Sequence, residues 1–203
     1  MKLLLHTCCA PCSTYSVNRF REGGWDVTGF WYNPNIHPFL EHQQRRRSME
    51  AYAERVLLPM VWSDEFEMPR FLRAVADRAA KPERCRVCYQ MRLERTAVMA
   101  RQCGCDAFST TLLISPYQDH ALLKQVGDEV GASHGIPFHY EDLRTGWSQR
   151  GRLTKEYGLY RQQYCGCIYS EWERYRDADQ GKARFPHPVP ATAGEGTQGN
   201  ASY

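Results

Sequence analysis

Nine cysteines occur in four short groups along this 203-residue chain, and any fold must accommodate all of them. The groups are Cys8, Cys9 and Cys12; Cys85 and Cys88; Cys103 and Cys105; and Cys165 and Cys167. Disulfide-stapled secreted domains are usually shorter and spread their cysteines along the chain. Adjacent residues such as Cys8 and Cys9 do not easily bridge each other, because neighbouring side chains diverge. The grouping therefore indicates thiols that converge on a metal, together with a redox pair.

The hydrophobic pattern predicts an α/β fold. Strands are expected at residues 3–6, 25–32, 106–110 and 136–140, and helices at 13–21, 37–55, 69–80, 83–102 and 118–130. Residues 56–61 form a short apolar segment, 131–135 are expected to form a loop, and 151–175 to be helical in part. Strands that alternate with helices favour a mostly parallel sheet covered on both faces, with sites at the carboxyl ends of the strands. Cys8, Cys9 and Cys12 follow the first strand, as Thr110 and Thr111 follow the third.

The chain is long enough for one domain with a full core, which we place at residues 1–181. Residues 182–203 are rich in Pro, Gly, Ala, Ser and Thr, and we expect a disordered tail there. The apolar run at residues 3–5 ends at His6, which is too short for a signal peptide, and no run approaches the roughly 20 residues that span a bilayer. We therefore expect a cytoplasmic protein without a membrane partner, whose thiols stay reduced.

The spacing Cys85-x-x-Cys88 at the start of a predicted helix lets both thiols face one point, where the helix N-terminus lowers their pKa. Alone, this motif fits a zinc knuckle, a redox pair or two incidental cysteines. With Cys8 and Cys9 it offers four thiolates, which suit structural zinc or a [4Fe–4S] cluster. An adjacent pair is a poorer tetrahedral clamp for one ion than for two corners of a larger cluster, so the pattern favours iron–sulfur.

The remaining thiols leave alternatives open. Cys12 is either a buried small hydrophobe or a ligand to a second metal beside the cluster. Cys165 and Cys167, separated by one glycine, fit a strained, redox-active disulfide or two more metal ligands. Asp119 fits a metal ligand, a general acid or a helix cap. We expect His6 to be a hydrogen-bonded core residue, and Cys103 and Cys105 to be buried structural residues.

Charge points to a polyanionic substrate. The net charge is only +3, but arginines gather at residues 45–47 and between residues 70 and 95, around the second cysteine group. A basic patch beside a reactive centre is typical of proteins that act on nucleic acids, although such a run is often only a solvated helix face. No phosphate loop is present, so the sequence does not support nucleotide hydrolysis.

Five segments of the chain form a joint pattern: residues 4–13 (LLHTCCAPCS), 31–38 (WYNPNIHP), 85–93 (CRVCYQMRL), 108–118 (FSTTLLISPYQ) and 157–170 (YGLYRQQYCGCIYS). Together they resemble one family, the cobalamin-independent epoxyqueuosine reductases (QueH). They occur in order over about residues 3–175, and the tail lies outside the resemblance.

The resemblance implies a HUP-like (Rossmann-like) three-layer fold with a cysteine loop in place of the phosphate loop, plus a helical C-terminal part. It implies a [4Fe–4S] cluster on Cys8, Cys9, Cys85 and Cys88, and a redox-active disulfide between Cys165 and Cys167. It also implies a second metal, iron or another divalent ion, for which Cys12 and Asp119 are our candidate ligands. The implied reaction is the last step of queuosine biosynthesis, two-electron removal of the epoxide oxygen of epoxyqueuosine at the tRNA wobble position.

The implied partners are tRNA, through its anticodon loop, and a reductant or electron-transfer protein of unknown identity. Two other functions fit some of the same features. A tRNA-sulfurating enzyme of the same fold would generally need ATP and a Ser-Gly-Gly phosphate loop, which this chain lacks. A non-catalytic zinc-binding RNA module would be colourless, whereas an iron–sulfur protein would be brown.

Overall fold

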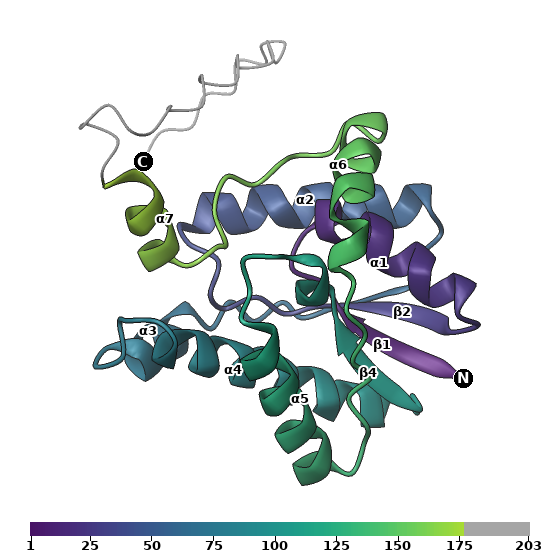
Figure 1. Cartoon of the computed structure of the whole chain (residues 1–203), viewed down its shortest axis with the longest axis horizontal. Coiled ribbons are helices and arrows are strands. Elements are labelled where there is room, and N and C mark those ends of the chain that lie inside the picture. Colours follow the sequence, from purple (N-terminus) through teal and green to yellow (C-terminus); the bar gives the residue numbers. More distant parts are fainter. Residues whose placement is uncertain (177–203) are drawn as a thin grey trace, which may run out of the picture.

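A four-stranded parallel sheet forms the centre of the protein, whose computed structural model describes residues 1–176 (Figure 1). The strand order is β3-β2-β1-β4. The strands are β1 (Lys2–His6), β2 (Asp26–Trp31), β3 (Met60–Trp62) and β4 (Ala107–Thr110). In register, Leu5 lies opposite Gly29 of β2 and Ser109 of β4. The predicted parallel sheet is confirmed.

Helices cover both faces of the sheet and make the three layers expected of a Rossmann-like fold (Figure 1). On one face lie α1 (Ala10–Glu22), α2 (Phe39–Arg55) and α6 (Trp147–Glu156); on the other lie α3 (Met68–Val75), α4 (Glu83–Gln102) and α5 (His120–His134). Two 3₁₀ turns, η1 (Thr111–Ile114) and η2 (Arg144–Gly146), and the last helix, α7 (Ile168–Tyr175), complete the described chain. None of the helices among residues 1–176 is long and apolar enough to cross a membrane.

The central strand explains why the site lies where it does. Leu3, Leu4 and Leu5 are fully buried because helices cover both faces of β1. A strand of this kind is a continuous apolar run, and its first polar residues come where it emerges at the sheet edge. In this chain those residues are His6 and Thr7, followed at once by the cysteine loop.

Two predicted elements are wrong, and one strand of the sheet was not predicted. Residues 131–135 are not a loop, since α5 continues to His134 and ends at Gly135, whose φ of 64° is the left-handed conformation that closes many helices. The glycines before it allow close packing: a Cβ on Gly127 would lie 2.2 Å from the Phe138 ring. Residues 136–140 are not a strand, because they make only an isolated bridge from Phe138 to Phe108. The sheet instead gains its fourth strand from β3, at residues 60–62.

Helix ends also differ from the prediction. Helix α1 starts at Ala10, three residues before the predicted start, because Pro11 in the first turn needs no hydrogen-bonded N–H there. Helix α3 ends at Val75 and not near residue 80. The predicted domain end at 181 and the predicted tail at 182–203 lie outside the described residues.

Candidate metal and redox site

Three buried thiols lie together at the carboxyl end of β1. The loop after the strand is so short that Cys9 is already the N-cap of α1, and Cys8, Cys9 and Cys12 are 7%, 1% and 5% exposed. Their Sγ atoms all lie within 4.8 Å of one another. The N-terminus of α1 carries partial positive charge, which favours thiolate and metal binding. This thiol trio can therefore hold a metal ion or part of a cluster.

The trio shares its protons unequally. Hydrogen bonds from the Cys12 and Cys9 thiols, and a third from the Thr111 hydroxyl, hold the pKa of Cys8 well below its usual range. Burial raises the pKa of Cys9, and hydrogen bonding to Cys8 raises the pKa of Cys12. Cys8 is thus the member of the trio that loses its proton most readily, and binding a cation would release the protons that the trio still holds.

The second thiol pair lies on the first turns of α4, as the Cys-x-x-Cys spacing predicts. The prediction that the helix N-terminus lowers their pKa is wrong, because burial raises the pKa of Cys85 to about 11 and that of Cys88 to about 12. Arg92, only 1% exposed, opposes this for Cys88: its Nη2 donates to the Cys88 Sγ at 3.1 Å and its Nε donates to the Cys88 carbonyl at 3.0 Å. One arginine charge thus favours the thiolate form of a cysteine whose burial disfavours it.

Arg92 also links the two thiol groups electrostatically, because its charge acts on Cys8 as well as on Cys88. Within residues 1–176, however, the trio is the only set in which three candidate ligand atoms lie within 4.8 Å of one another. The four predicted cluster ligands, Cys8, Cys9, Cys85 and Cys88, are therefore not drawn together that closely, and their joint role stays a prediction.

The Cys165–Cys167 segment is fastened to α2 and to the loop after β2. Arg45, 1% exposed, donates from Nη1 to the Cys165 carbonyl at 2.9 Å and from Nη2 to the Tyr164 carbonyl at 3.0 Å, while its Nε pairs with Glu41 at 2.7 Å. The backbone N–H of His37 donates to the Gly166 carbonyl at 2.8 Å. Cys165 is exposed and Cys167 is buried, and all nine cysteines are thiols.

Gly166 is required at the turn between the two cysteines. Its φ of 144° is a conformation that other residues rarely adopt, and a Cβ there would lie 3.2–3.4 Å from Ile36, Asn35 and Arg45. Only glycine fits this backbone conformation and this space. The turn that it makes leaves Cys165 exposed and Cys167 buried.

Two glutamines each contact one of the thiol groups, and sequence reasoning assigned them no role. Gln162 lies 2.9 Å from the Cys9 Sγ through Nε2, and its buried Oε1 has no hydrogen-bond partner among the described residues. Gln118 lies 3.5 Å from the Cys165 Sγ through Nε2, and its Oε1 accepts from the Tyr89 hydroxyl at 2.9 Å. Both residues lie inside the segments that carry the family resemblance, and only that resemblance could have pointed to them from the sequence.

The other predicted residues are placed as follows. His6 is a core residue: its Nδ1 is 2.9 Å from the Thr110 hydroxyl and its Nε2 is 3.1 Å from the Tyr32 carbonyl. Asp119 caps α5, accepting from the Leu122 N–H at 3.0 Å. The expectation that Cys103 and Cys105 are buried is wrong: Cys103 lies exposed at the C-cap of α4, and Cys105 is only half-buried.

The fold and this site define a class: a Rossmann-like α/β protein with a thiol-bearing loop at the carboxyl end of its first strand. One solved structure shares the fold, a "predicted subunit of tRNA methyltransferase" from Methanocaldococcus jannaschii, with a TM-score of 0.50, 11% identity and 92% of each chain covered. At this identity the likeness concerns the fold alone.

The family is shown by sequence comparison. The family model for epoxyqueuosine reductase QueH matches residues 3–173. Curated proteins of that name are 42% identical in Dehalococcoides mccartyi (86% of this chain, 94% of the relative), 37% in Thermotoga maritima (85% and 91%) and 34% in Acinetobacter baylyi (91% and 87%). The chain belongs to the QueH family, which favours the reductase over the sulfurating enzyme and the zinc module.

Proposed function

We propose that this protein is an epoxyqueuosine reductase that removes the epoxide oxygen from epoxyqueuosine in tRNA and leaves queuosine. The observation that carries the proposal is an exposed thiol, Cys165, separated by one glycine from a buried thiol, Cys167, in a protein that also holds a buried thiol trio. A cytoplasmic location, where tRNA is found and thiols stay reduced, fits this activity.

The dithiol matches the stoichiometry of the reaction. Loss of an epoxide oxygen as water consumes two electrons and two protons and leaves an alkene. Oxidation of Cys165 and Cys167 to a disulfide releases two electrons and two protons, and an external reductant then restores both thiols. Cys165 is the exposed member, so we assign it to the substrate side. Cys167, at the N-cap of α7, is the partner that closes the disulfide.

The buried thiols are suited to hold the metal centre. We assign Cys8, Cys9, Cys85 and Cys88 to a [4Fe–4S] cluster, and Cys12, with Asp119, to a second metal, iron or another divalent ion. The support is chemical: all four cluster candidates are thiols, two of them lie in the trio at the α1 N-terminus, and Cys88 accepts a hydrogen bond from Arg92. Such a centre supplies single electrons and a Lewis acid for the departing oxygen.

The rim around Cys165 is suited to a single-stranded loop of RNA. Tyr117, next to Gln118, is 79% exposed, and its ring meets Trp147 edge-to-face at 5.7 Å. Trp147 in turn lies 3.8 Å from the buried guanidinium of Arg150. Arg161 is exposed and next to Gln162. Exposed aromatic rings stack bases, and cations meet phosphates, where an anticodon loop is bound.

The test is conversion of the substrate. Anaerobically reconstituted protein is incubated with tRNA bearing epoxyqueuosine and a chemical reductant, and digested nucleosides are identified by mass spectrometry. The proposal predicts loss of one oxygen and appearance of queuosine. A double substitution, Cys165→Ser with Cys167→Ser, should strongly slow turnover while leaving visible absorbance of the cluster. Absence of conversion by the wild-type protein would contradict the proposal, and full activity of the double variant would remove the redox role of the pair.

A further inference from the structure

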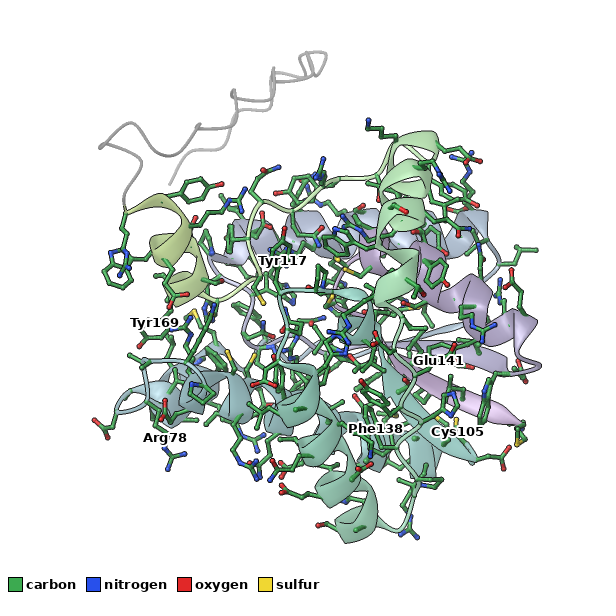
Figure 2. All side chains as sticks on the ribbon, in the orientation of Figure 1. Arg78, Cys105, Tyr117, Phe138, Glu141 and Tyr169 are labelled. Carbon is green, nitrogen blue, oxygen red and sulfur yellow. The ribbon has the colours of Figure 1, made fainter. Side chains whose placement is uncertain are left out.

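A recess of about 850 Å³ opens between α7 and the connection from α3 to α4, beyond the cysteines. Its lining combines cationic and aromatic side chains: Lys81, Arg84 and Arg176, with Tyr169, Trp172 and Glu173. Figure 2 shows Tyr169 below α7, on the side that faces α3 and α4. Cys167 is the N-cap of α7, the helix that forms one side of the recess, so the recess adjoins the proposed redox pair.

The charges of the recess favour an anion. Arg84 is 3% exposed, and its Nη2 is 2.6 Å from one oxygen of Glu173, which Lys81 also approaches at 3.4 Å. One carboxylate thus faces two cations. In addition, the buried Nε of Arg84 has no hydrogen-bond partner among residues 1–176. A buried guanidinium with an unpaired N–H is a costly arrangement, and together with Lys81 it makes the recess more positive than the single carboxylate of Glu173 balances.

The aromatic side chains provide a face for a planar group. Trp172 is 58% exposed, although tryptophan is usually well buried, and the guanidinium of Arg176 lies 4.8 Å from its ring. Arg84 lies 5.5 Å from the Tyr169 ring. A planar ring beside Trp172 and an anionic group beside Lys81 and Arg84 together describe a nucleotide.

We propose that this recess binds a nucleotide that flanks the target nucleoside in the RNA, with its base on Trp172 and its phosphate beside Lys81 and Arg84. The inference rests on the proposed function, because the target nucleoside goes to the exposed thiol of Cys165. The recess lies on the far side of the buried Cys167 from Cys165. It would therefore bind a nucleotide next to the target nucleoside in the same RNA loop. Base stacking needs no particular base, so this contact adds affinity and orientation for the loop.

The test measures binding, not turnover. Affinity for a fluorescent, unmodified anticodon stem-loop is determined by anisotropy for the full-length protein and its variants. We expect Trp172→Ala to weaken binding about tenfold and Trp172→Phe to retain most of it, as stacking requires. We expect Lys81→Ala to weaken binding and to reduce the slope of log affinity against log salt by about one. Lys124→Ala, on the distant helix α5, is the matched charge control and should bind like wild type.

The outcomes separate this inference from the proposed function. If the wild-type protein binds no stem-loop, both fall. If the wild type binds and Trp172→Ala binds equally well, the recess is not an RNA site, while the proposed function stands. Unchanged RNA affinity with slower turnover in the presence of a protein reductant would assign the recess to the electron donor and overturn the inference. Circular dichroism of each variant checks the fold, which Trp172 should not affect because it is largely exposed.

Discussion

Arg45 holds the redox segment in place, and replacing it should loosen that segment. In Arg45→Met a buried cation that bonds two loop carbonyls and the Glu41 carboxylate is lost. Breaking a buried pair by removing one partner costs about 3–5 kcal/mol. Glu41 keeps one partner, the Tyr160 hydroxyl at 2.6 Å, which favours the lower end of that range. A change of 3 kcal/mol corresponds to a fall in Tm of about 6–12 °C for a domain of this size.

The assay combines thermal unfolding with hydrogen exchange. If the loss is global, Tm falls by this amount; if it is local, amides of residues 160–167 lose protection while Tm changes little, and both results fit the reasoning. The matched control is Arg46→Met, one residue along the same helix, whose pairs with Glu50 and Asp64 are at the surface and worth at most about 1 kcal/mol. Unchanged Tm together with unchanged protection of the segment in Arg45→Met would refute the reasoning.

Three further outcomes are expected. Burial, followed by the charge of Arg92, lowers the pKa of His6 from 6.5 to about 4. The folded protein therefore favours the neutral ring, so the full free energy of unfolding is present above pH 6.5 and about 3 kcal/mol of it is lost as the pH falls to 4. An NMR titration of the His6 ring with a midpoint near 6.5 would contradict this. In metal-free protein, iodoacetamide should label the exposed Cys165 well before the buried Cys9, as peptide mapping would show, and equal rates would count against the burial of the trio. Cys88→Ala should lose most iron and sulfide on chemical analysis after anaerobic reconstitution, and wild-type contents would remove Cys88 from the ligands.

Much of the fold is predictable because its signals are local. The apolar run ending at His6 and the Cys-x-x-Cys start of α4 correctly predict β1 and the longest helix. Residues 131–135 mislead because glycine serves close packing against Phe138 as well as turns. The three-residue strand β3 carries too little pattern to be distinguished from a loop.

The candidate site is less predictable, because long-range contacts build it. Clustering of cysteines correctly predicts a thiol site after β1, and the structure brings Cys12 into it. The clamp by Arg45 joins residues 120 positions apart, and Gln162 meets Cys9 across 153 positions. Neither contact leaves a local pattern. An arginine in a basic run also looks like a solvated residue, and only the fold reveals that Arg45 is buried.

The most direct test of the central claim is a single-turnover reaction without external reductant. Reconstituted protein with Cys165 and Cys167 fully reduced is mixed with a limiting amount of epoxyqueuosine tRNA, quenched with an alkylating agent, and analysed by peptide and nucleoside mass spectrometry. The account predicts one Cys165–Cys167 disulfide for each queuosine formed, because two thiols supply the two electrons that the oxygen requires. Queuosine formed while both thiols remain reduced would contradict it.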